Sequence, residues 1–436
     1  MQLAAQTTGV KKAAWNISCC ILLFGMMKEK RFWIGLSLLN LSVVALFGLL
    51  MRSKMLYSLP FLNYKNILNA HSHFAFGGWV GLALITYLVY DVLPEHLGRR
   101  KIYQRVLWGM ELSSIGMALS FPFFGYKGIS IVISCFYILV IYVFGWAFFY
   151  DLKRSQLQPT VRWLSFGSVA SLLLSSLGPF ALVYIIVSKS TDSLLYRDSI
   201  YTFLHFQYNG FFTLAIFALF FTDWLKKGYK LPSAAKNFSL ALLLSVVPTL
   251  FLSMLWHNLV LLYVVAALGC LFILVSVFYF LPVFAQSLKK DFFVQPLAKA
   301  MWIAAFLSFI IKMVLTIGTI YPPLGQAVYG ARPVIIGFLH LVFLAFVSFY
   351  ILSNAIRDGF YTRHQKTIAY PFYIFGAGVL VNELFLMLQG LEILFKTYTP
   401  IYVQLLWYGA ILLFVGSVCL AVAFYANRQA KKRPQR

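Results

Sequence analysis

Five histidines of this 436-residue chain lie within long apolar stretches in which other ionisable side chains are rare. They are His71, His73, His205, His257 and His340. Neutral imidazole binds haem iron and copper, and an ionisable side chain inside a bilayer is costly enough to indicate a function. Any one of these residues could instead be a hydrogen-bonded histidine of ordinary helix packing. Their occurrence in four separate stretches favours a set of ligands.

The segment 69–79 reads Asn-Ala-His-Ser-His-Phe-Ala-Phe-Gly-Gly-Trp. On a helix, His71 and His73 project about 200° apart, so only one of them can face a given metal. The sequence leaves open which of the two that is. The two glycines that follow would allow the close approach of a flat macrocycle or of a neighbouring helix. Trp79 would line such a pocket or simply fill space.

The segment 205–210, His-Phe-Gln-Tyr-Asn-Gly, is the most polar run inside any apolar stretch. His205 and Tyr208 are three residues apart and therefore share a helix face. This arrangement suits a metal ligand beside a phenol that supplies a proton or an electron. The alternative is a polar contact between two helices.

The composition indicates which elements position these residues. The chain is 61% hydrophobic and only 11% charged, with a mean hydropathy of +0.82, which excludes a soluble globular domain. Stretches of about 20 apolar residues cross a bilayer as helices, so we predict an all-α integral membrane protein, a bundle of twelve transmembrane helices. The predicted spans are 32–51, 68–92, 104–125, 129–150, 163–187, 199–222, 237–257, 259–283, 298–320, 333–355, 370–394 and 403–426.

The loops predict the orientation of the bundle. Most of the 36 Lys and Arg residues fall in loops on the same side as both termini, and basic loops stay in the cytoplasm. The net charge of +24 then reflects membrane topology. With both termini cytoplasmic, the histidines lie within about 10 Å of the outer ends of their helices. Residues 1–31 would be a cytoplasmic segment with Met27 as a candidate true start, 32–426 the membrane domain, and 427–436 a basic cytoplasmic tail.

Twelve helices with histidines in the outer parts of helices two, six, seven and ten resemble subunit I of the haem–copper oxidase and nitric oxide reductase superfamily. The resemblance covers about residues 32 to 426 and rests on topology and histidine placement. It implies that His71 or His73, together with His340, holds a low-spin haem b. It also implies that His205 and His257 occupy positions of copper ligands and that Tyr208 lies near the place of a redox tyrosine.

The chain departs from the family pattern in its catalytic half. Helix ten has the single His340 where the family has two histidines, and helix seven has His257-Asn258 in place of two adjacent histidines. Two imidazoles do not complete a copper site. We therefore expect a divergent member, an oxidoreductase for electron transfer or for chemistry on a diatomic gas, with nitric oxide favoured over oxygen. At least one haem b is expected, and a second haem or a copper ion would lie near His205 and Tyr208.

The resemblance also implies a location and partners. It predicts the bacterial cytoplasmic (inner) membrane, an electron donor of the quinol or cytochrome c type, and small partner subunits beside membrane lipid. Nucleic acid is not an expected partner, because the basic residues follow the loops.

Four charged residues are further candidates. Glu111, Lys312 and Glu383 lie inside predicted spans, where they would be functional groups or form a salt bridge between the lysine and a glutamate. Arg332 flanks helix ten on the outer side. It would contact haem propionates or anchor the helix at the interface.

Two other functions stay open at this stage. Twelve helices also suit a transporter of a metal or of a proton-coupled solute, although the histidine layer is off centre for an alternating-access site. A haem-binding or sensing membrane protein without turnover would differ from the favoured function only in the second site.

Overall fold

The computed structural model describes residues 29–290, 292–293, 295–325, 331–361, 368–397 and 399–430. The described chain is helical, and twelve of its helical runs are long and apolar enough to cross a membrane. The predicted bundle of twelve spans is therefore confirmed, with ends that differ from the predicted ones by a few residues. The proposed start at Met27 and the last residues of the basic tail lie outside the described residues.

The spans are called helix one to helix twelve in chain order. Helix one is α2 (Lys30–Leu56), helix two is α3 (Tyr64–Phe74) with η1 (Ala75–Gly81), α4 (Leu82–Tyr87) and η2 (Leu88–Val92), helix three is α6 (Lys101–Phe124), and helix four is α7 (Ile129–Arg154). Helix five is α8 (Pro159–Leu174) with α9 (Leu177–Ser188), helix six is α10 (Ser193–His205) with η3 (Phe206–Phe212) and α11 (Thr213–Lys226), helix seven is α12 (Ser233–Leu250) with η4 (Phe251–His257), and helix eight is α13 (Val260–Leu288). Helix nine is α14 (Pro296–Gly318), helix ten is α16 (Arg332–His340) with η5 (Leu341–Ser348) and α17 (Phe349–Arg357), helix eleven is α18 (Ala369–Phe395), and helix twelve is α19 (Ile401–Ala430).

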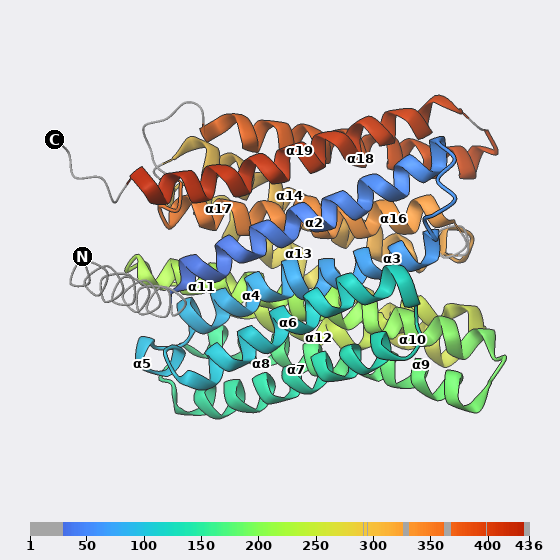
Figure 1. Ribbon diagram of the computed structural model, residues 1–436. Helices are drawn as coiled ribbons and strands as arrows, with labels where there is room; N and C mark the ends of the chain where they lie inside the picture. Colours follow the sequence, from blue (N-terminus) through green and yellow to red (C-terminus); the bar gives the residue numbers. More distant parts are fainter. Residues whose placement is uncertain are drawn as a thin grey trace, which may run out of the picture.

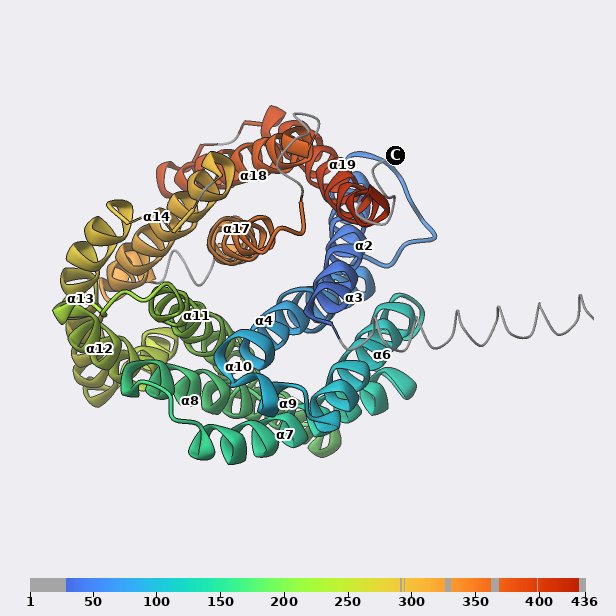
Figure 2. The same ribbon diagram turned by 90° about the vertical axis from the view of Figure 1, so that its left-hand side faces the viewer.

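Helices two, six and ten form the interior of the bundle. In the most apolar window of helix two 89% of the residues are buried, and in that of helix six 78%, against 28% in helices four and eight. Viewed along the bundle, α17 of helix ten lies in the middle of a ring made by the other helices (Figure 2). Helices four and eight consequently present most of their surface to lipid, which is why they are apolar on all sides.

The two ends of the bundle differ in the side chains that they carry. α3, α10 and α16 lie together at one end (Figure 1), here called the histidine end. The opposite end, called the charged end, contains Lys30 at the start of α2 and Arg357 at the end of α17. The basic loops predict that the charged end faces the cytoplasm.

Candidate functional site

His71 and His340 are the two histidines that the structure presents as a pair. The Nδ1 atom of His71 lies 2.9 Å from the Val44 carbonyl oxygen of α2, and Nδ1 of His340 lies 2.8 Å from the Ile336 carbonyl oxygen. Because a carbonyl only accepts, each Nδ1 carries the proton and each Nε2 keeps its lone pair. Neither Nε2 has a hydrogen-bond partner among the described residues, and the two rings lie within electrostatic range of each other. Metal-binding histidines are usually fixed by such a second hydrogen bond.

The part of helix ten that carries His340 is incompletely buried. None of the nine residues of α16 is buried, although α16 packs on α18 and its Phe338 ring lies 5.5 Å from the Tyr208 ring of helix six. In α17, by contrast, every residue from Phe349 to Ile356 is buried. The side chains of α16 are therefore less completely covered by their neighbours than those of α17.

A glycine on helix one makes room for His71. A Cβ atom added to Gly48 would lie 3.4 Å from Cε1 of His71, which is the near limit of ordinary van der Waals contact. Gly48 follows Val44, the residue that holds the imidazole, by one helical turn. Helix one therefore supplies both the hydrogen-bond acceptor and the space for this ring.

Two arginines lie beside the histidine pair. Arg52 of α2 is within electrostatic range of His71, His340 and Arg332, and the Arg332 guanidinium lies 4.8 Å from the centre of the Tyr64 ring. Neither arginine forms an ion pair with a carboxylate in the described parts of the chain. Two neighbouring guanidinium groups without a counter-ion favour the binding of an anion, which they can hold bidentately.

His73 is fully satisfied by the protein. Its Nδ1 lies 2.9 Å from the Asn69 carbonyl oxygen, and its Nε2 lies 2.8 Å from the Tyr126 hydroxyl. A tyrosine hydroxyl is protonated at neutral pH, so the Tyr126 hydroxyl donates to Nε2. The structure thus separates the two histidines that the sequence leaves equivalent: His71 has a free nitrogen and His73 does not.

His205 is a satisfied core histidine. Only 2% of its surface is exposed, its Nε2 donates to the Val246 carbonyl oxygen at 2.7 Å, and its Nδ1 lies 3.1 Å from the Asn209 amide nitrogen. Beside it, a cavity of about 50 Å³ is lined by Tyr208, Thr316 and Phe338 among others. This volume holds a water molecule or two but no macrocycle.

His257 belongs to a different group of side chains. Its Nε2 lies 2.9 Å from one carboxylate oxygen of Asp198, while the Trp256 indole donates to the other oxygen at 3.0 Å. Each histidine expected at a copper position is thus bound to a partner of its own. Among the described residues, no three His, Cys, Asp or Glu side chains lie close enough together to hold a metal ion.

Helices two, six and ten change to π-helix at their histidines. η1 begins two residues after His73, η3 directly after His205, and η5 directly after His340. A π-helical turn weakens the regular hydrogen-bond ladder and is frequent at functional sites. Sequence patterns do not reveal such turns, and they are the main feature of the site that the sequence could not predict.

Side chains bind the carbonyl groups that these π-helical turns release. The Gly78 carbonyl accepts from the Asn40 amide at 2.8 Å, and the Phe343 carbonyl accepts from the Ser348 hydroxyl at 2.7 Å. The Tyr208 carbonyl accepts from the Thr213 hydroxyl at 2.6 Å. Because a bare carbonyl in a dry interior is costly, these side chains stabilise the irregular backbone.

Lys312 contacts the π-helical turn of helix six. Its ammonium group is fully buried, lies 3.3 Å from the Tyr208 carbonyl oxygen and donates to the Thr213 hydroxyl at 2.7 Å. The alternative of a salt bridge to a glutamate is not formed within the described chain. Glu111 instead accepts from Asn40 at 2.8 Å, and Glu383 accepts from Asn382 at 3.1 Å.

Trp79 lies away from the histidine pair. It is eight residues below His71, about 12 Å along the helix, and its indole donates to the Ser348 hydroxyl at 3.0 Å. Only 1% of its surface is exposed. Of the two interpretations of Trp79, the structure favours the one in which it fills and links the core.

Known proteins give no guide to the function of this site, so its function is inferred from its geometry. No protein-family model matches the chain, and no curated protein is detectably similar to it in sequence.

Proposed function

We propose that this chain is a membrane haem protein that binds one haem b between helices two and ten and transfers electrons through it. The observation that carries the proposal is the pair of free Nε2 atoms on His71 and His340, each opposite an Nδ1 that is fixed to a backbone carbonyl. The incomplete burial of α16 and the glycine beside His71 support it. His71 and His340 would hold the haem iron, which would supply a one-electron redox centre.

The protein contributes orientation and charge to such a site. The hydrogen bonds to Val44 and Ile336 hold both rings in the tautomer that can bind a metal. Arg52 and Arg332 would receive the two carboxylates of the haem. Their positive charge would also favour the reduced, more negative form of the group.

The second haem or copper site near His205, which the resemblance also implies, has less support. The ring nitrogens of His205 are both hydrogen-bonded, and the cavity beside it is small. We therefore place electron transfer ahead of gas chemistry as the proposed activity.

An absorbance spectrum tests the proposal. The purified, dithionite-reduced protein should show a b-type α-band near 560 nm, and metal analysis should give one iron per chain without copper. A folded protein that stays colourless after expression with added haem precursor would refute the proposal. Two irons per chain, or iron together with copper, would instead support a second metal site near His205.

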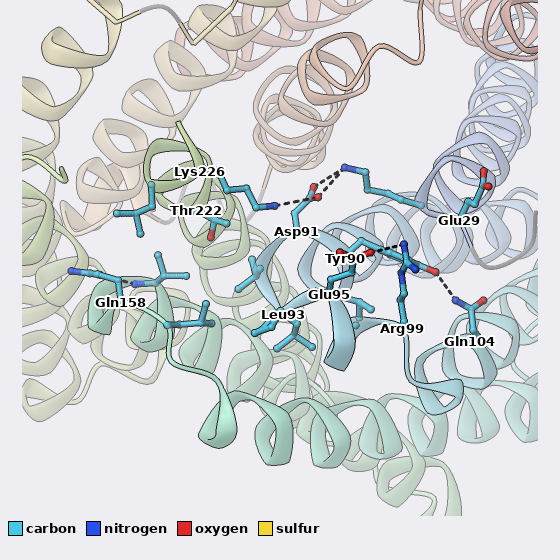
Figure 3. Close-up of a pocket in the computed structure, with 18 residues that line it drawn as sticks. Glu29, Tyr90, Asp91, Leu93, Glu95, Arg99, Gln104, Gln158, Thr222 and Lys226 are labelled. Atoms are coloured by element: carbon cyan, nitrogen blue, oxygen red, sulfur yellow. Dashed lines mark hydrogen bonds and ion pairs between the residues drawn. The ribbon is translucent and has the colours of Figure 1, made fainter. Parts of the chain in front are cut away.

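A second candidate function has one observation in its favour. A cavity of about 990 Å³ opens at the charged end between α11, α8 and the loop after η2 (Figure 3). A cavity of this size suits a transported solute. A colourless protein would therefore be tested next as a transporter that is open at this end.

A further inference from the structure

Helix eleven carries a carboxyl group in the middle of the membrane, on the outside of the bundle. Glu383 lies 14 residues after Ala369, the first residue of α18, and 12 residues before Phe395, the last. Its side chain is only half-buried. Viewed along the bundle, α18 belongs to the outer ring of helices (Figure 2). An ionisable group at this depth is costly unless a partner satisfies it.

The protein satisfies only one of the two oxygens of this carboxyl group. The Asn382 amide donates to Oε1 of Glu383 at 3.1 Å. Among the described residues, no hydrogen bond reaches Oε2 and no cation forms an ion pair with the group. The second oxygen therefore needs a partner from outside the described chain, and lipid tails offer no hydrogen-bonding group.

Glu383 belongs to a stripe of residues on α18 that the rest of the chain leaves wholly or partly uncovered. The stripe repeats at intervals of three and four residues and consists of Tyr373, Gly376, Leu380, Glu383 and Met387. Tyr373, Leu380 and Met387 are 61%, 69% and 56% exposed, and a Cβ atom added to Gly376 would meet no atom within 4 Å. Alternation of three and four is the spacing with which two helices pack side by side at a small crossing angle.

Gly376 and Glu383 supply the two features that hold membrane helices together. Because lipid tails are as apolar as leucine, helices associate in a bilayer through close packing at small residues and through hydrogen bonds between polar side chains. Gly376 is seven residues from Glu383, two turns away on the same face, and leaves space for a neighbouring backbone. Their presence on one stripe indicates a contact with another helix.

A second copy of helix eleven fits these features. The basic loops orient every copy alike in the membrane, so the two-fold axis of a dimer runs along the membrane normal. Residues beside that axis face their own equivalents at the same depth. A carboxyl group without a cation in an apolar medium favours its neutral form, which both donates and accepts. Two Glu383 side chains that face each other can therefore satisfy each other.

We propose that two copies of this chain associate through helix eleven, with the Glu383 carboxyl groups hydrogen-bonded to each other across the two-fold axis. Gly376 of each copy allows the two backbones to approach, and Leu380 and Met387 pack between them. The association completes the hydrogen bonding of a group that one copy leaves half satisfied. This proposal does not depend on haem.

Association in bilayers tests the dimer. The full-length protein, with one fluorophore on a C-terminal tag, is diluted in vesicles of phosphatidylethanolamine and phosphatidylglycerol, and photobleaching steps are counted per particle. Glu383→Leu should weaken the association about tenfold, as expected for a polar contact between membrane helices. Glu383→Gln, whose amide also donates and accepts, should change it by less than about threefold. A chain that stays monomeric at the highest protein density would overturn the proposal.

A second variant blocks the contact without altering the single copy. The side chain of Gly376→Trp enters open space in one copy but occupies the place of the second helix, so dimers should be lost while the thermal unfolding midpoint is kept. Leu139→Trp is the matched control, because Leu139 is 62% exposed on α7, and it should leave the association unchanged. Equal effects of the two variants would contradict a contact at Gly376.

Disulfide formation locates the contact while Gly376 and Glu383 stay in place. On mild oxidation in the membrane, Leu380→Cys and Met387→Cys should each give a disulfide-linked dimer several-fold faster than Leu139→Cys and than the native cysteines alone. A single copy that is instead joined at Met387→Cys to a smaller polypeptide would refute the second copy as the occupant of this face.

Discussion

The Trp79 indole donates a hydrogen bond of 3.0 Å to the Ser348 hydroxyl, which in turn donates to the Phe343 carbonyl. This contact joins the π-helical segments of helices two and ten in the middle of the membrane. Trp79→Phe removes the bond and part of the buried volume, at a cost of roughly 1–3 kcal/mol. We expect a lower midpoint of thermal unfolding in detergent.

The matched control for that variant is Trp146→Phe. Trp146 is 65% exposed on helix four, where it faces lipid. Equal shifts for the two variants would show that the Trp79–Ser348 contact does not stabilise the core.

The next prediction concerns the two histidines proposed to hold the haem. His71→Ala and His340→Ala should each abolish the low-spin b-type absorbance, since a bis-histidine site needs both imidazoles. His73→Ala and His205→Ala should keep it, because all four ring nitrogens are hydrogen-bonded to the protein. Absorbance of the reduced proteins, normalised to protein mass, checks this. Loss of the band in His73→Ala with retention in His71→Ala would reverse the assignment.

The two arginines at the histidine end should tune the reduction potential. Removing one positive charge beside the proposed haem disfavours the reduced form, which carries one more electron. Arg332→Gln should therefore lower the midpoint potential in a spectroelectrochemical titration. Lys127→Gln, an exposed cation in a loop of the same end, should leave the potential unchanged.

Lys312 should be dispensable for stability. Its ammonium is buried without a carboxylate partner in the described chain, and a buried charge of this kind can be replaced by an apolar side chain without loss. Lys312→Met should raise or preserve the unfolding midpoint, because Thr213 still donates to the Tyr208 carbonyl. Thr213→Val, which leaves the lysine without its closest partner, should lower the midpoint. A large fall for Lys312→Met would assign the lysine a structural role.

The ion pairs of Arg357 with Asp223 and Asp358 should hold the charged end together. Arg357→Gln leaves Asp223 and Asp358 without their shared cation, and breaking a buried ion pair from one side costs about 3–5 kcal/mol. The unfolding midpoint should fall strongly, while Arg99→Gln, which removes a pair whose side chains are 72% and 75% exposed, should have little effect. Equal effects would mean that the ion pairs of Arg357 are screened like surface charge.

The sequence predicted the twelve spans because each is an apolar run of membrane-spanning length, with basic loops concentrated on one side, and the bilayer permits few other structures. It also predicted that the histidines of helices two, six and ten share one end. It could not distinguish His71 from His73, since that depends on the Val44 carbonyl of helix one and on Tyr126. Arg52 was missed because a basic residue at a helix end is also an ordinary interfacial anchor.

The π-helical turns have a consequence for how this bundle can change. An inserted residue in an α-helix rotates everything beyond it by about 100°, whereas a π-helical turn absorbs the extra residue locally. In helices two, six and ten that turn lies at the histidine. The direction in which each imidazole points around its helix axis is therefore set independently of the packed segment that follows the π-helical turn. Ligand geometry at one membrane face can be altered without disturbing the charge pairing at the other.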